Sequence, residues 1–173
     1  MRISIAGFTG AGKTTVAELL SKRLNVPHIC FSFKDEARLR GMSLMELQIL
    51  AAQNKRIDIE FDERQRERMN QCKDFVTSTW LGPWFANADL NVWLYAEDGV
   101  RAERVAKRDG ISTEEALKNI RLRDQQNKER YLKLYNIKIG DINKFDICIN
   151  TEKYLPNNIC DIIMYAYNTR KNG

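Results

Sequence analysis

The sequence predicts an α/β fold, with a five-stranded parallel sheet flanked by helices. Short apolar segments alternate with helical ones along the whole chain, which is the order that parallel strands joined by crossover helices produce. A length of 173 residues suits one domain with a real core, and 43% hydrophobic against 29% charged residues excludes wholesale disorder. A glycine-rich segment also separates the first strand from the first helix. We therefore expect a single domain over residues 1–173.

The individual elements follow from the spacing of apolar residues. Strands are expected at residues 3–7, 26–31, 75–77, 89–95 and 145–150. Helices are expected at residues 14–24, 33–70 (broken near Gly41, with a last piece over 57–70), 99–108, 112–135 and 157–168. Two of these helices begin with the spacing of a capping box, Ser43 with Glu46 and Ser112 with Glu115.

Composition excludes several classes of protein. No apolar run approaches the ~20 residues that a bilayer span requires, and the stretch before Gly7 is too short for the apolar region of a signal peptide. We therefore expect a soluble, cytoplasmic protein with no membrane partner. The sequence has no CxxC pair and one histidine, His28, in an apolar stretch, so zinc knuckles, disulfide frameworks and histidine-based triads are not expected. We interpret the cysteines as small buried hydrophobic residues: Cys30, Cys72, Cys148 and Cys160.

Positive charge is concentrated in one segment. The net charge is +5, and residues 101–138 hold eleven Lys and Arg against six Asp and Glu. Such an excess can mark a phosphate site, a nucleic-acid surface or a solvated helix. Nucleic-acid binding is not expected, because residues 101–130 contain no aromatic side chain on which a base could stack.

The strongest motif is a phosphate-binding loop at residues 7–14. These residues read GFTGAGKT, which matches G-x-x-x-x-G-K-[ST], between a buried strand and an amphipathic helix. Glycines let the backbone curl so that successive N–H groups face a polyphosphate at a helix N-terminus. We expect Lys13 to reach the β- and γ-phosphates and the Thr14 hydroxyl to bind Mg²⁺. The expected nucleotide-binding residues here are Gly7, Gly10, Ala11, Gly12, Lys13, Thr14 and Thr15.

Two sets of basic side chains are candidates for the same chemistry. Arg123, Asn127 and Arg130 lie at i, i+4 and i+7, so they share one helix face. Arg104 and Arg108, at i and i+4 on the preceding helix, form a second face. Phosphoryl transfer depends on positive charge placed around the transferred group, and arginines on a mobile helix can supply that charge. We expect Lys13, Arg123 and Arg130 to be catalytic, with Arg104 and Arg108 at the nucleotide.

A set of longer segments extends the pattern beyond the loop and the arginines: 1–7, 33–34, 40–44, 57–58, 62–65, 101–108, 110–112, 115–117, 123–124, 130–131 and 146–151. With these segments the sequence resembles the archaeal-type cytidylate kinases, a branch of the nucleoside monophosphate kinase family with a P-loop NTPase fold. The resemblance implies transfer of the γ-phosphoryl of ATP to CMP or dCMP with Mg²⁺. It also implies a core over 1–30, 71–107 and 136–173, a helical acceptor-binding insert near 31–70 and a lid near 108–135. By the same resemblance Arg130 is a lid arginine, and Arg123 with Asn127 lies near the monophosphate.

The resemblance fails at the acceptor phosphate. Where the family has a stretch like E-G-R-L-A-G-W, residues 78–84 read STWLGPW, so Trp80 replaces the arginine and Ser78 the acidic residue. Trp cannot form a bidentate pair with a phosphate. Lys34 also replaces an arginine. Three accounts stay open. In the first, the protein is a CMP-type kinase in which Lys34, Arg38 or Arg40 takes the place of the missing arginine. In the second, it is a related kinase in which Trp80 stacks on a different acceptor. In the third, it binds nucleotide as a switch or weak ATPase.

Other positions are less informative. Asp58, Asp62 and Gln65 are candidates for reading the base of the acceptor, although a solvated surface is the simpler interpretation for each. Trp84, Phe85 and Trp93 are expected in the core. No symmetric patch marks a partner surface, so the expected partners are small nucleotides and the oligomeric state stays open.

Overall fold

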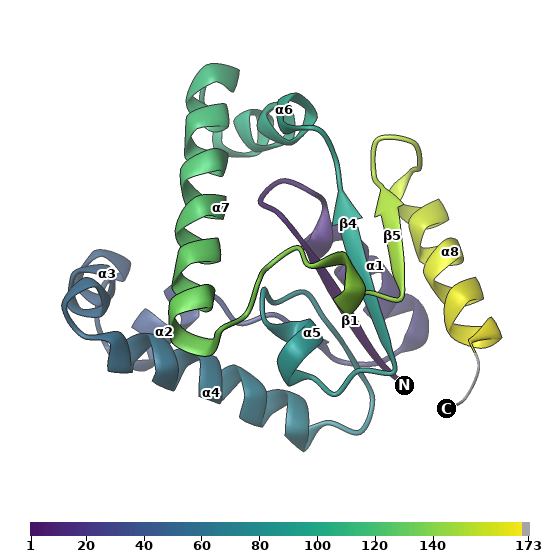
Figure 1. Ribbon diagram of the computed structural model, residues 1–173, viewed down its shortest axis with the longest axis horizontal. Coiled ribbons are helices and arrows are strands. Elements are labelled where there is room, and N and C mark those ends of the chain that lie inside the picture. Colours follow the sequence, from purple (N-terminus) through teal and green to yellow (C-terminus); the bar gives the residue numbers. More distant parts are fainter. Residues whose placement is uncertain (171–173) are drawn as a thin grey trace.

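The computed structural model describes residues 1–170 and has a five-stranded parallel sheet at its centre (Figure 1). The strand order is β2-β3-β1-β4-β5, and every neighbouring pair is parallel. The predicted fold class is therefore confirmed. The strands are β1 (Arg2–Gly7), β2 (His28–Ile29), β3 (Phe75–Thr77), β4 (Leu90–Tyr95) and β5 (Ile147–Asn150). The outer strands β2 and β5 are shorter than the apolar runs predict.

Helices connect and cover the strands. The helices are α1 (Lys13–Leu24), α2 (Phe33–Leu39), α3 (Leu44–Gln53), α4 (Lys55–Gln71), α5 (Gly82–Phe85), α6 (Asp98–Asp109), α7 (Thr113–Tyr135) and α8 (Pro156–Thr169), with a short 3₁₀ helix η1 (Ile142–Lys144). The long helical region after residue 33 divides into α2, α3 and α4, and the sequence pattern missed α5. Ser43 and Glu46 form the predicted capping box, whereas at α7 the Ser112 side chain accepts from the Glu115 N–H without the reciprocal bond.

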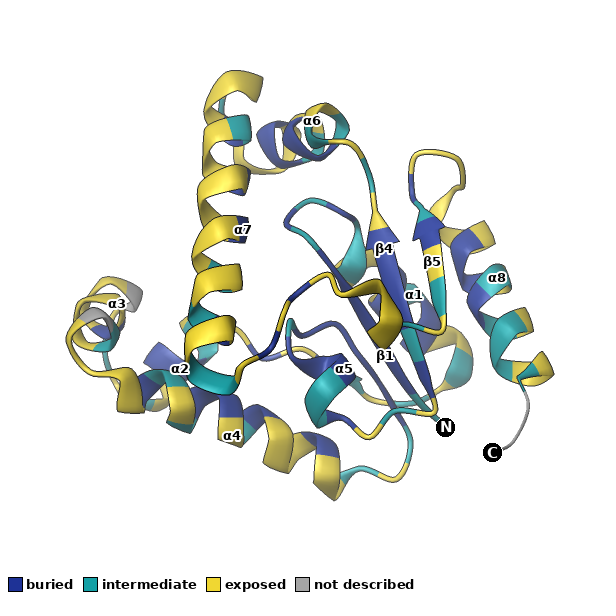
Figure 2. Ribbon diagram, in the orientation of Figure 1, coloured by how far each residue is buried: buried dark blue, intermediate teal, exposed yellow. Residues whose placement is uncertain are grey.

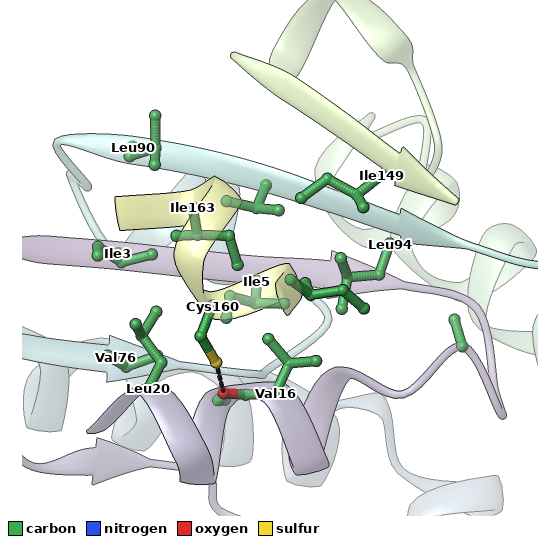
Figure 3. Packing of buried hydrophobic residues seen from close by; sticks show 14 residues of the cluster. Ile3, Ile5, Val16, Leu20, Val76, Leu90, Leu94, Ile149, Cys160 and Ile163 are labelled. Carbon is green, nitrogen blue, oxygen red and sulfur yellow. Dashed lines mark hydrogen bonds between the residues drawn. The ribbon is translucent and has the colours of Figure 1, made fainter. Parts of the chain in front are cut away.

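The main core lies between the sheet and helices α1 and α8 (Figure 3). Ile3 and Ile5 alternate along β1 and point to this side, where they meet Val16 of α1 and Ile163 of α8. Each fully buried aliphatic side chain stabilises the fold by about 1.5–3 kcal/mol. The residue between them, Ser4, is also buried, on the opposite face of the sheet. This core fixes the carboxyl end of β1, where the phosphate-binding loop begins.

A second cluster covers the other face of the sheet. Its buried members include Ala6 of β1, Trp93 of β4 and Tyr131 near the end of α7. Trp93 is buried as predicted, whereas Trp84 and Phe85 of α5 are only half-buried at the edge of this cluster. The packing of Tyr131 anchors the C-terminal end of α7 over the sheet, while much of the remaining helix is exposed (Figure 2).

Helices α2 and α4 are joined by a buried carboxylate. Glu36 of α2 is 0% exposed and bonds Arg40 Nε through Oε1 at 2.6 Å. Its second oxygen lies 3.2 Å from Arg64 Nε of α4. A buried charge requires such partners, because leaving it unpaired costs several kcal/mol. The α2–α4 region therefore has its own ionic centre beside the sheet.

The cysteine interpretation is wrong for half of the cysteines. Cys160 is buried, and its Sγ lies 3.7 Å from the Val16 carbonyl oxygen (Figure 3). Cys72 is half-buried, but Cys30 and Cys148 are exposed: Cys30 directly follows the outer strand β2, and Cys148 lies within the outer strand β5. Within residues 1–170, all four thiols are free, and no helix is long and apolar enough to cross a membrane.

Candidate nucleotide-binding site

A cavity of about 1880 Å³ opens at the carboxyl ends of the central strands. Parallel α/β sheets bind ligands at this edge, where neighbouring strands connect to opposite faces. The loop after β1 forms one part of its wall, helix α4 another and helix α7 a third. The segment after β5 lines the mouth. The cavity therefore brings together segments that are far apart in the sequence.

The phosphate-binding loop has the geometry that its glycines predict. Gly12 caps α1 in the left-handed region at φ 89°, and no side chain caps the helix. A Cβ on Gly12 would meet nothing within 4 Å, so this backbone faces open space. At Gly10 (φ 81°) a Cβ would lie 2.7 Å from the Arg101 carbonyl oxygen, so only glycine fits there. The N-terminal amides of α1 are thus available to an anion.

The predicted loop residues divide into two groups. Gly10, Gly12, Lys13, Thr14 and Thr15 line the cavity. Gly7 and Ala11 do not: Gly7 pairs with Leu94 at the end of β1, and Ala11 is 0% exposed in the main core. Because these two residues hold the loop from behind, they support it without facing the cavity.

Lys13 lies in a shielded part of the cavity. Its Nζ donates to the Phe8 carbonyl oxygen at 2.9 Å and lies 5.0 Å from the centroid of the Trp80 ring. Burial and the positive charge of Arg123 together lower the pKa of Lys13 to about 8, against the opposing effect of Asp124. The positive charge of the Lys13 ammonium is poorly balanced by nearby negative charge, so a polyphosphate ligand would stabilise it.

A buried ion pair ties α6 and α7 to the phosphate-binding loop. Arg101 of α6 and Asp124 of α7 are both 5% exposed and bond through Nη1 and Oδ2 at 2.7 Å. Asp124 Oδ1 also accepts the Thr9 N–H at 3.0 Å, and Arg101 Nη1 donates to the Thr9 carbonyl oxygen at 2.8 Å. Sequence reasoning missed these roles. Asp124 is an acid within a basic face, which was the available signal, but the spacing does not reveal a partner 115 residues away.

Arg104 and Arg108 both line the cavity but differ in their partners. Arg104 donates to the Thr151 hydroxyl and to the Thr151 carbonyl oxygen, each at 2.8 Å, so its guanidinium is fixed beside the segment after β5. Arg108 is exposed, and it forms two hydrogen bonds with the carboxylate of Asp109. Arg104 is thus the better ordered of the two.

The predicted face of α7 turns into the cavity. Arg123, Asn127 and Arg130 all line it, as their spacing requires. Asn127 donates from Nδ2 to the Arg123 carbonyl oxygen at 2.9 Å. Arg130 is held by α4: its Nη2 lies 3.2 Å from Asp58 Oδ1 and 3.1 Å from Asp62 Oδ2. The candidate catalytic arginine therefore has two carboxylate partners on the neighbouring helix.

Asp62 and Gln65 are buried, so the interpretation of a solvated surface is wrong for both. Asp62 is 0% exposed, and its Oδ2 also accepts from the Tyr135 hydroxyl at 3.0 Å. Burial raises the pKa of Asp62 to about 6, although Arg130 acts in the opposite direction. Asp58, which is half-buried, has a pKa raised for the same reason. Asp58 and Gln65 line the cavity, whereas Asp62 turns toward α7 instead.

The candidates for acceptor binding are also separated. Lys34 lines the cavity, but Arg38 does not: its side chain is 75% exposed and lies 3.9 Å from Asp35. Trp80 and Ser78 both line the cavity. The Ser78 hydroxyl bonds His28 Nε2 at 2.9 Å, and burial lowers the pKa of His28, which favours its neutral form. Trp80 faces Lys13 at the position where the family resemblance places an arginine.

Comparisons with known proteins agree with this geometry. Residues 30–153 match the model of the cytidylate kinase-like family. The cytidylate kinase of Pyrococcus abyssi is 42% identical over 166 residues, covering 95% of this chain and 92% of that protein. An uncharacterized protein from Eubacterium ventriosum superposes with a TM-score of 0.71 at 21% identity, covering 98% of this chain and 99% of that one. A shikimate kinase from Bacteroides thetaiotaomicron gives 0.58 at 18%, covering 97% and 98%. These two structures share the fold, and the sequence matches confirm the predicted resemblance: the chain belongs to the cytidylate kinase-like family.

Proposed function

We propose that this protein transfers the γ-phosphoryl group of ATP to CMP or dCMP. Family membership makes the chain a nucleoside monophosphate kinase, and the relatives that match nearly its whole length are named cytidylate kinases. The observation that carries the proposal is the single cavity shared by the phosphate-binding loop, the polar face of α4 and the arginines of α7. Donor and acceptor can therefore meet inside one cavity.

We assign the ATP phosphates to the loop, where the amides around Gly12 and the ammonium of Lys13 face the cavity. The adenosine then extends toward Arg104 and residues 151–155, which line the mouth. The acceptor lies on the far side, among residues 31–70, with residues 108–135 acting as the lid. Lys34 and Asn127 are the candidates for its phosphate, because both line the cavity and Arg38 does not.

Mg²⁺ fits this site through Thr14. The Thr14 side chain is exposed at the first turn of α1 and lines the cavity. Within residues 1–170, no cluster of three or more His, Cys, Asp or Glu forms a metal cage. That arrangement suits Mg²⁺, which commonly binds one or two protein oxygens together with substrate phosphates and water. Bound in this way, it would neutralise charge on the phosphates.

Phosphoryl transfer to a monophosphate requires positioned substrates and positive charge around the transferred group, and it requires no general base. A nucleoside monophosphate has a second pKa near 6, so its phosphate oxygen is already ionised at neutral pH. Arg123 and Arg130 are placed to stabilise negative charge on the transferred group. Arg130 must exchange its carboxylate partners Asp58 and Asp62 for phosphate oxygens to do so. The α7–α4 contact is thus expected to loosen when both substrates bind.

A coupled assay of ADP release tests the proposal directly. ADP formation is measured with Mg²⁺ATP alone and with CMP, dCMP, UMP, AMP or GMP. The proposal requires the fastest rate with CMP or dCMP and little ADP without an acceptor. Equal rates with and without an acceptor identify an ATPase and overturn it. Lys13→Ala is the matched inactive control, because a contaminating kinase would keep its activity in that preparation.

A different acceptor is the second candidate, and Trp80 favours it. An aromatic ring 5.0 Å from Lys13 Nζ occupies the place of an arginine and can stack on a flat group. Replacing Trp80 with arginine separates the two candidates. If CMP is the acceptor, Trp80→Arg lowers the KM for CMP about tenfold or more, since a charged contact contributes about 1.5–3 kcal/mol. An unchanged or higher KM for CMP supports a different acceptor.

A further inference from the structure

One face of helix α4 carries a polar pattern that the transfer chemistry leaves unused. Asp58, Phe61 and Gln65 lie at i, i+3 and i+7, and all three line the cavity. Asp62 does not, because its carboxylate bonds Arg130 and Tyr135 of α7. The face thus presents a carboxylate, an aromatic ring and a carboxamide, in that order, to a ligand.

Gln65 is the most unusual of the three. It is 6% exposed, and its carboxamide forms no hydrogen bond with any other part of residues 1–170. Since Gln65 lines the cavity, the small exposed part of its side chain faces that space. Its amide is not among the fully enclosed unpaired polar atoms of the described residues, so its donor and acceptor can be reached from the cavity. Such a group is expected where a ligand completes the hydrogen bonds.

The surroundings of Gln65 favour a flat, partly apolar ligand. Phe61, one turn earlier, is 6% exposed and stacks on Phe31 with ring centroids 5.8 Å apart. Phe33 packs edge-on against Phe61 at 5.2 Å. These rings form a rigid apolar wall that lines the cavity beside the polar groups of α4. A heterocyclic base has both the apolar face and the polar edges that this wall requires.

The spacing of Asp58 and Gln65 fits one pyrimidine. Seven residues of α-helix rise about 10.5 Å. Both side chains line the cavity from these positions, so a ligand between them can form a hydrogen bond at each of its two edges. One pyrimidine ring, with its 2-oxo and 4-amino substituents pointing apart, can occupy the space between them. The carboxylate can only accept a hydrogen bond, while the amide can donate one.

We propose that Asp58 and Gln65 read the base of the acceptor, with Gln65 donating to the 2-oxo group and Asp58 accepting from a 4-amino group. This inference rests on the proposed function and deepens it. The 2-oxo group is common to cytosine and uracil, so Gln65 contributes affinity for both. The 4-amino group belongs to cytosine alone, and a carboxylate there repels the 4-oxo group of uracil. Asp58 is therefore the residue that distinguishes CMP from UMP.

Steady-state kinetics with CMP and UMP test the two roles separately. Gln65→Leu is expected to raise the KM for both nucleotides tenfold or more, with the CMP:UMP ratio of kcat/KM and the KM for ATP little changed. Asp58→Asn is expected to lower that ratio at least tenfold. Because Asp58 also contacts Arg130, the kcat of the Asp58→Asn variant can fall. This effect is common to both acceptors, so it cancels in the ratio.

The control is Gln71→Leu, the same substitution on the same helix at an exposed position outside the cavity. Gln65→Glu is a second variant that keeps the side-chain volume and removes the donor, so it tests the site if the leucine variant does not fold. Equal KM values for the Gln65 variants and Gln71→Leu, or an unchanged ratio in Asp58→Asn, overturn the proposal. Titration of CMP by calorimetry separates this result from failure of the proposed function, since wild-type protein without transfer activity can still bind CMP.

Discussion

Arg130 Nη2 donates to Asp62 Oδ2 at 3.1 Å, which joins the candidate catalytic arginine of α7 to a buried carboxylate of α4. Asp58 adds a second carboxylate oxygen at 3.2 Å. The positive charge of Arg130 is thus balanced by carboxylates of α4, the helix to which we assign acceptor binding. For catalysis Arg130 must leave these two carboxylates, and phosphate oxygens of the two substrates must take their place.

Arg130→Ala is expected to lower kcat about 10³-fold while leaving the KM for ATP within a few-fold of wild type. An arginine that acts on the transferred group stabilises charge that develops in the transition state, so its loss falls on turnover. Arg121→Ala is the matched control, because Arg121 is exposed on the same helix and pairs with Asp98 outside the cavity. A rise in the KM for ATP as large as the loss in kcat would assign Arg130 to ground-state binding.

Asp62→Asn is expected to change how stability depends on pH. The folded-state pKa of Asp62 is raised to about 6 from 3.8, so the native state binds more protons than the unfolded state between these values. The wild-type free energy of unfolding therefore loses about 2–3 kcal/mol from this group as pH rises from about 4 to 6. Urea denaturation at pH 4.5 and 7 measures it: the variant minus wild-type difference must increase with pH. A constant difference contradicts the assignment.

ATP binding is expected to weaken above pH 8. The pKa of Lys13 in the free protein is lowered to about 8, and only the ammonium form pairs with phosphate. As pH rises through this value, the lysine loses its proton and binding must be coupled to proton uptake. Calorimetric titrations with Mg²⁺ATP between pH 6.5 and 9.5 measure the decline. Lys13→Arg stays protonated and should show a flat profile, whereas a flat profile for wild type would contradict the prediction.

Asp124→Asn is expected to destabilise the protein by about 3 kcal/mol. The substitution leaves Arg101, which is 5% exposed, without its buried counter-ion. It also weakens the bond to the Thr9 N–H, so ATP affinity should fall along with stability. Thermal denaturation and ATP titration measure the two effects. Glu129→Gln, an exposed acid on the same helix, is the control, and equal stabilities of the two variants would refute the buried pair.

The fold was predictable from sequence because its strongest patterns are local. The spacing of Ile3 and Ile5 in β1, and of Val16 and Leu20 in α1, reflects periodicities of two and of three to four that arise within one element. The short helix α5 was missed because four residues, GPWF, carry no period. The extent of β2 was overestimated because its length depends on β3, with which only His28 and Ile29 pair.

The site was predictable only where a motif fixes the backbone. The loop at residues 7–14 places Lys13 and Thr14 without reference to the rest of the chain. Pairings such as Arg130 with Asp62 cannot be read from spacing, because they join residues 68 positions apart. The burial of Gln65 was missed for the same reason. The many charged residues of α4 indicate a solvated helix unless the position of α7 beside it is known.

The Thr9–Asp124 bond attaches α7 to the phosphate-binding loop near the middle of the helix, since Asp124 lies between the ends at Thr113 and Tyr135. The helix is also held near its two ends, because Ala116 packs against α6 and Tyr131 packs over the sheet. A shift of α7 that separates Arg130 from α4 must therefore also strain the Thr9–Asp124 bond. Occupancy of the phosphate-binding loop and the contact with α4 are in this way mechanically coupled.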